Sequence, residues 1–312
     1  MCDAAVARIA DTAAEAAVDA AWAQWSALVP IAAPGGARRV WTLVDPEALV
    51  LLSLAGRERE PRLDDLLAAW ARVGSSLLGV QRLGTLAAVY PWPVRDGIGD
   101  FARMAADAGD GRWKRYASGA ARSEPGPRRK DAGPLRLTDG PALMLRLRAG
   151  LGVSAKADLL TVLLGLGGAP AELRMLALST GYSDRAVRTA AEEMALARLI
   201  HDVPGPRAAY RADPEAWARL LSTEVPAWRH WGSVFAFLAA VIDWARRAEQ
   251  EGWSPYVASS RARDLVEEHG KRLRHAAWPL PDPAATRGAA YLEVFADAVD
   301  AAARWTREHL YG

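Results

Sequence analysis

Two arginines in the first turns of one expected helix, residues 184–198, have the chemistry needed to recognise a nucleic-acid base. Apolar residues recur at three- and four-residue steps along this helix, beginning at Val187, and they mark its inner face. Arg185 and Arg188 therefore belong to the outer face, together with Thr189. An arginine can donate two parallel hydrogen bonds to the major-groove edge of guanine. The spacing predicts that Arg185 and Arg188 contact bases.

Further cations suit contacts with phosphates. Arg207 lies at the tip of an expected hairpin and Arg211 lies just behind it. A third group lies in a segment rich in proline and glycine, within residues 112–148, which carry ten basic and three acidic side chains and hence a local charge of +7. This segment either follows phosphates along a duplex or is only a solvated loop. The three adjacent cations at its centre are Arg128, Arg129 and Lys130.

Residues 154–221 contain the elements that position these side chains. An apolar helix over 156–168 ends in a glycine pair, and Pro170 begins a second short helix that Gly181 closes. Ser183 has the residue type and position of an N-cap for the third helix. Two short strands, 199–203 and 208–211, then surround the tight tip 204–207, and a helix begins at Asp213-Pro214.

This segment resembles the winged helix-turn-helix transcriptional regulators, at the level of a superfamily and over about a fifth of the chain. The phrase that carries the resemblance is Gly181-Tyr-Ser-Asp-Arg-Ala-Val-Arg-Thr-Ala-Ala-Glu-Glu-Met194. In that superfamily the third helix enters the major groove and the wing touches the backbone. The resemblance implies double-stranded DNA as the partner, with Ser183, Arg185, Arg188 and Thr189 near the bases.

The charge of the segment leaves a second interpretation open. Residues 154–223 hold eight basic and eight acidic side chains, whereas DNA-binding modules are more often basic. Winged helices also serve as protein-binding modules, so an adaptor or antitoxin-like partner protein is the alternative. An enzyme on a helical scaffold is a third possibility, although the five histidines lack metal-ligand spacing and no catalytic motif occurs. We therefore expect no catalysis, no cofactor and no metal.

Composition sets further limits. The formal charge of the 312 residues is only +2, so there is no global electrostatic argument for nucleic acid. The single cysteine, Cys2, favours a cytoplasmic location. Acidic residues within 1–29 make a poor signal peptide, and no uncharged apolar run is long enough to cross a membrane. The sequence identifies no small-molecule effector.

The expected fold is mostly α, with a central winged helix-turn-helix and a C-terminal helical bundle. The expected parts are an N-terminal helical domain (1–110), a basic linker (111–140), the winged helix-turn-helix domain (141–223) and the bundle (224–312). Within the first part, the helices expected near 63–73 and 76–89 form a possible second helix-turn-helix, with Gln81 and Arg82 pointing outward.

The C-terminal region has a regular apolar seam. Its residues are spaced three and four apart, which is typical of helix pairing: Trp228, Trp231, Phe235, Leu238, Ile242 and Ala245. The seam either packs inside the bundle or meets a second copy of the chain. We expect a homodimer, because two copies place two DNA-reading helices on successive major-groove faces.

Overall fold

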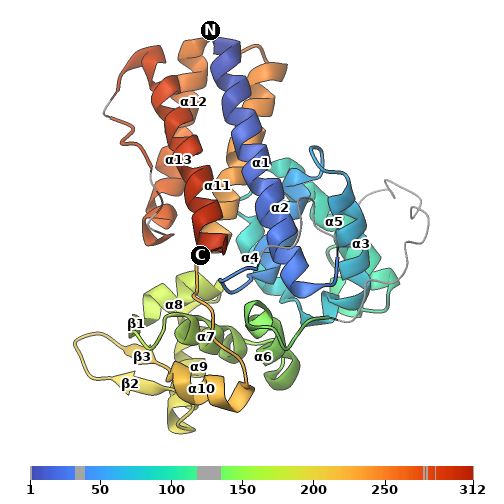
Figure 1. Ribbon diagram of the computed structural model, residues 1–312, viewed down its shortest axis with the longest axis vertical. Helices are drawn as coiled ribbons and strands as arrows, with labels where there is room; N and C mark the ends of the chain where they lie inside the picture. The colour runs from blue at the N-terminus through green and yellow to red at the C-terminus, as the bar shows by residue number, and fades with distance from the viewer. Residues whose placement is uncertain are drawn as a thin grey trace.

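The computed structural model describes residues 2–31, 39–117, 135–276, 278, 280–284 and 286–311. Within these residues the protein is mostly α-helical, with thirteen α-helices and three short strands. Figure 1 shows long helices in the upper half and a cluster of short helices with a small sheet in the lower half. None of the described helices combines the length and the apolarity needed to span a bilayer.

Five helices make up the N-terminal region. They are α1 (Cys2–Leu28), α2 (Pro46–Gly56), α3 (Arg62–Val73), α4 (Val80–Ala87) and α5 (Trp92–Asp107), with short 3-10 turns at Ser75–Leu77 and Gly111–Trp113. Asp45 caps α2 by accepting a hydrogen bond from the Ala48 amide, and Pro46 occupies the first turn, as the Asp-Pro pair predicts. Helix α2 is buried along nearly its whole length, so it forms the centre of this region.

Three long helices close the chain and pack against α1. They are α11 (Trp231–Gln250), α12 (Pro255–Leu273) and α13 (Tyr291–Tyr311), with 3-10 turns at Arg274–Ala276 and Gly288–Ala290. Helix α1 lies beside α11 and α13 in Figure 1 and makes its most extensive contacts with them. Buried side chains from Ala5 to Leu310 form a single core. The sequence placed residues 1–110 and 224–312 in separate domains, whereas their helices share this core; we call them together the helical body.

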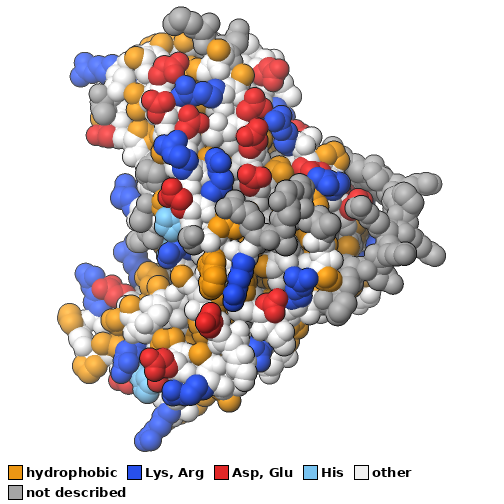
Figure 2. All heavy atoms as spheres, viewed as in Figure 1, with side chains coloured by type: hydrophobic (Ala, Val, Ile, Leu, Met, Phe, Trp, Pro, Cys, Tyr) orange, Lys and Arg blue, Asp and Glu red, His pale blue; other side chains and the backbone are white. Residues whose placement is uncertain are grey.

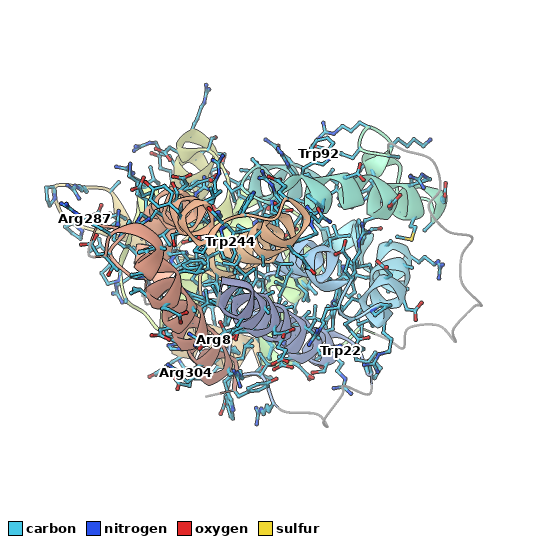
Figure 3. The ribbon with its side chains drawn as sticks, turned by 90° about the horizontal axis from the view of Figure 1, so that it is seen from above. Arg8, Trp22, Trp92, Trp244, Arg287 and Arg304 are labelled. Atoms are coloured by element: carbon cyan, nitrogen blue, oxygen red, sulfur yellow. The ribbon has the colours of Figure 1, made fainter. Side chains whose placement is uncertain are left out.

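Four residues of the apolar seam are part of that shared core, whereas Trp228 packs in a separate cluster and Ile242 is half-buried. Trp231, Phe235 and Leu238 are fully buried and Ala245 is nearly so, because α1 and α2 cover α11. Figure 3 shows Trp244, one residue before Ala245, deep among the long helices. The seam therefore does not present a free surface for a second copy of the chain, which corrects the dimer surface expected from the sequence.

A second core lies in the lower half of the molecule. Its elements, which we call the central module, are η3 (Gly140–Ala142), α6 (Leu143–Leu151), α7 (Ala155–Gly165), β1 (Ala171–Glu172), α8 (Leu173–Thr180), α9 (Asp184–Leu196), β2 (His201–Val203), β3 (Ala209–Arg211) and α10 (Pro214–Leu221). The strands form an antiparallel sheet in the order β1-β3-β2. Ala171 is paired with Tyr210, and Asp202 is paired with the same residue from the other side.

From α7 to α10, the central module follows the expected order of elements, with one difference. Residues 171–172 were expected to begin a helix, but they form β1 because they pair with β3, and α8 begins only at Leu173. Gly181 ends α8 in the left-handed conformation, as a C-terminal glycine should. In α9, Val187, Ala191 and Met194 are buried and form the expected inner face.

An extended segment, residues 39–44, connects the two cores. The Leu43 amide donates a hydrogen bond to the Ala227 carbonyl (3.0 Å), and the Trp228 amide donates one to the Gly165 carbonyl at the end of α7 (2.8 Å). A Cβ at Gly165 would lie 2.6 Å from Leu43 Cδ1 and 2.8 Å from the Trp228 backbone nitrogen. Because no side chain fits there, glycine is required for this close approach.

Candidate functional site: an exposed arginine surface and a buried charge cluster

The outer face of α9 carries the side chains that the sequence singled out. Arg185, Arg188 and Thr189 are all exposed. Neither arginine forms an ion pair with another described residue. Ser183 is the N-cap of α9 and its hydroxyl accepts a hydrogen bond from the Ala186 amide (3.3 Å). Both guanidinium groups are therefore accessible to a ligand that approaches the N-terminal half of α9.

The hairpin β2–β3 also presents cations to solvent. Arg207, near its tip, and Arg211, in β3, are exposed. In the free protein, Arg207 donates to Glu172 of β1 at 3.2 Å, and both side chains of this pair are at least half exposed. Such surface pairs contribute only about 0–1 kcal/mol, so a phosphate can compete with Glu172 for Arg207. The cations Arg128, Arg129 and Lys130 lie outside the described residues.

The described residues on the face shown in Figure 2 have mixed charge. Figure 2 shows cationic and acidic side chains interspersed over α1 and α13, with no continuous field of one sign on that face. Arg8 of α1, for example, is within 4.0 Å of three carboxylates on α13. The helical body therefore presents no extended basic surface on this face, and attraction of a polyanion depends on local groups of arginines.

A cluster of five charged side chains is buried where the central module meets the helical body. Its members, which we call the buried charge cluster, are Asp45, Glu47, Arg82, Arg148 and Asp158, each at most 1% exposed. Both arginines make bidentate contacts. Arg82 donates to the two Asp45 oxygens at 2.6 and 2.7 Å, and Arg148 donates to the two Asp158 oxygens at 2.6 and 2.8 Å.

Glu47 joins the two halves of the buried charge cluster. One carboxylate oxygen accepts from Arg148 Nη1 at 2.6 Å and from the Gly79 amide at 2.6 Å, and the other accepts from Arg82. Three carboxylates against two guanidinium groups give the cluster a formal charge of −1. Asp45 and Glu47 lie at the N-terminus of α2, where the helix dipole stabilises negative charge.

Arg82 connects the buried charge cluster to the end of α8. Its Nε donates to the Thr180 carbonyl at 2.7 Å, and so satisfies one of the last carbonyl groups of α8. The turn at Gly181 and α9 follow immediately. The sequence placed Arg82 on an outward face, but the side chain is fully buried, while Gln81 is exposed. Arg82 therefore fixes the position of α8, and with it α9, relative to the helical body.

The pKa of Glu47 shows that its cationic and hydrogen-bonding partners outweigh the effect of burial. Burial alone would raise it, but attraction by Arg148 and Arg82, with hydrogen bonds from Arg148 and Gly79, outweighs burial and lowers the pKa from 4.5 to about 2. Glu47 is therefore ionised in the folded protein across the physiological range. Close to the cluster, burial and the nearby Asp158 raise the pKa of Tyr182, so its hydroxyl remains protonated.

The lowered pKa of Glu47 predicts a specific acid sensitivity. Its contribution to stability is fully present above the unfolded pKa of 4.5 and is lost as the pH falls to about 2. The corresponding free energy is about 3 kcal/mol. Urea unfolding at pH 5, 4, 3 and 2.5 should show this loss of unfolding free energy. In Glu47→Gln, the unfolding free energy should fall less steeply with pH over the same range. Glu249 is exposed, so Glu249→Gln serves as the control. The same pH dependence of the unfolding free energy in the wild type and both variants would contradict the lowered pKa of Glu47.

The sequence contained a signal for the buried charge cluster. Asp158 interrupts the apolar run of α7 and Arg148 interrupts the Leu- and Met-rich α6. A charged residue on an apolar face implies a buried partner of opposite sign. The pairing across the whole cluster was not predictable, because its members come from three stretches that lie far apart in the chain, around residues 45–47, at residue 82 and at residues 148–158.

Comparisons of the chain with protein-family models, with curated proteins and with solved structures found no match. In the described part of the chain, no group of three or more histidine, cysteine, aspartate or glutamate side chains is arranged to hold a metal ion.

Proposed function

We propose that the protein is a DNA-binding transcriptional regulator and that its central module is a winged helix-turn-helix. The order of α7, β1, α8, α9, β2 and β3, with a left-handed glycine between α8 and α9, supports this assignment. The observation that carries it is the exposure of Arg185 and Arg188, without ion pairs among the described residues, in the first turns of α9. Helices at this position enter the major groove, and arginines there read guanine.

Salt dependence of binding tests this proposal with the full chain. The module offers four exposed cations to DNA, from α9 and the hairpin, so log Kd against log salt should have a slope of roughly 3 to 4. Fluorescence anisotropy with a mixed-sequence duplex at several salt concentrations measures it. Absence of binding at low salt would overturn the proposal.

The hairpin is expected to contact phosphates rather than bases. Arg207→Ala/Arg211→Ala should weaken binding to matched and scrambled duplexes alike and should reduce the salt slope by about two. Arg304→Ala is a suitable control, because Arg304 is exposed on the outer side of α13 (Figure 3) and has no ion pair within the described residues. A loss confined to the matched duplex would instead assign the hairpin to base reading.

One observation favours a protein partner as the second candidate. Leu196 at the end of α9 is 87% exposed, and Leu220 in α10 is 72% exposed. Exposed apolar patches mark protein-interaction sites, and these two leucines are the most exposed large apolar side chains among the described residues. If the module is an adaptor, Leu196→Ser/Leu220→Ser should abolish capture of one stoichiometric protein from the source cells. Capture of no protein by the wild type, or equal capture of the same protein by the variant, would exclude the adaptor function.

A further inference from the structure

An open pocket of about 800 Å³ lies at the junction of the central module and the helical body. Helix α8 and the turn after it form one side, with Arg174, Met175 and Tyr182. The opposite side comes from α4, the start of α11 and the end of α12. We call it the junction pocket. A pocket of this size is sufficient for a small organic molecule.

Cations are in excess around the junction pocket. Arg174 of α8 faces it from the module, and Lys271, Arg272 and Arg274 from the end of α12. All four are exposed, and none forms an ion pair with a described carboxylate.

Two of the three acidic residues that line the junction pocket already have cationic partners. Glu172 accepts hydrogen bonds from Arg207, and Asp45 accepts them from Arg82. Against four exposed cations, the described lining has one carboxylate, that of Asp184, for which no ion pair is found among the described residues. The rim is therefore suited to a negatively charged group.

The floor of the junction pocket is apolar. Leu86, Val89 and Met175 line it together with Trp228. Trp228 is 4% exposed, and its indole N–H has no hydrogen-bond partner among the described residues. A ligand that matches the cationic rim and the apolar floor carries an anionic group at one end and an apolar or aromatic part at the other.

We propose that the junction pocket binds such an amphipathic organic anion and that its occupancy changes the DNA affinity of α9. The effect on DNA rests on the proposed function. Asp45 lines the pocket and is also held by Arg82, which donates to the Thr180 carbonyl at the end of α8. An anion between Arg174 and Lys271 would contact the module and the body at once. Its binding therefore favours one placement of α8 and α9 over others.

Binding is tested first, on the full chain without DNA. The probe is 8-anilinonaphthalene-1-sulfonate, and N-phenyl-1-naphthylamine has the same rings without the charge. The sulfonate should bind at one site, at least tenfold more tightly than the neutral compound. Arg174→Ala/Lys271→Ala should weaken binding of the sulfonate at least tenfold. Leu178→Trp, which adds a larger side chain to the pocket lining, should prevent its binding. Arg304→Ala should have no effect. Equal affinity of the wild type for both compounds, or equal affinity of all variants for the sulfonate, would overturn the proposal that the junction pocket binds an organic anion.

The effect on DNA is tested second. A saturating concentration of the sulfonate should change the DNA affinity of the wild type at least fivefold, and should leave that of Leu178→Trp unchanged. If the wild type binds the probe but no DNA, the proposed function fails and the pocket stands. If DNA affinity does not change on saturation, the pocket is no effector site. Weaker DNA binding by Lys271→Ala/Arg272→Ala without the probe would assign these cations to the DNA surface and overturn the proposal.

Discussion

Replacing Arg82 by methionine is expected to lower the free energy of unfolding by about 3–5 kcal/mol. The change leaves Asp45 without its bidentate partner and Glu47 with Arg148 as its one cationic partner in the cluster, and all of these side chains are buried. Removing one member of a buried charge network costs more than the contact itself, because the remaining charges stay out of water.

The neighbouring residue provides a matched control for this prediction. Gln81 precedes Arg82 on α4 and is exposed, so Gln81→Met should change the free energy of unfolding by less than about 0.5 kcal/mol. Urea denaturation of the three proteins at pH 7 gives the comparison. A loss of less than 1 kcal/mol in Arg82→Met would contradict the role given to the buried charge cluster. Because Arg82 also holds the end of α8, the same variant should show faster amide hydrogen exchange in α8 and α9.

The largest expected effect on DNA binding comes from Arg185→Ala/Arg188→Ala. Each bidentate contact with guanine contributes about 1–3 kcal/mol of discrimination, so the two together should contribute roughly 2–6 kcal/mol. The affinity for the preferred duplex should therefore fall at least 30-fold relative to the affinity for a scrambled duplex. Both side chains are exposed, so the fold should be unaffected.

Competition binding separates base reading from simple attraction. The double variant and Arg304→Ala are each titrated with the preferred and the scrambled duplex at one salt concentration. Equal losses of affinity for both duplexes would show that Arg185 and Arg188 contact phosphates and do not read bases. An unchanged affinity for both duplexes would remove α9 from the DNA interface, and the exposed leucines of α9 and α10 would then become the stronger candidate for recognition.

The regular elements were predictable because their signals are local. Four helices begin directly after an aspartate or a serine, which are residue types typical of N-caps, and in each case the side chain accepts a hydrogen bond from a backbone amide. The caps are Asp45 of α2, Ser183 of α9, Asp213 of α10 and Ser254 of α12. The inner face of α9 was equally predictable, because burial follows the helical period.

Long-range partners were not predictable from one sequence. Strand β1 exists only because Ala171 pairs with Tyr210, and a two-residue strand has no periodicity of its own. The seam on α11 was recognised as apolar, but its partners α1 and α2 lie at the other end of the chain. Core and interface residues have the same composition, so the sequence alone did not distinguish packing within one chain from dimerisation.

Arg82 illustrates the same limit in the candidate site. An arginine on a short helix is most often solvated, and nothing within several residues of it in the sequence indicates a partner. Its burial follows from Asp45 and Glu47, which α2 brings to the same point, and from the α8 carbonyl that it satisfies. The outward arginines of α9 were predictable for the opposite reason, since exposure requires no partner.

Selection of binding sites from a random duplex library by the full chain tests DNA reading by α9 most directly. The wild type should converge on a motif with guanine at positions contacted by Arg185 and Arg188. Arg188→Ala should lose the preference at one of these positions and retain the rest of the motif. Recovery of no motif by the wild type, or of the same motif by both proteins, would contradict the assignment of α9 as the base-reading helix.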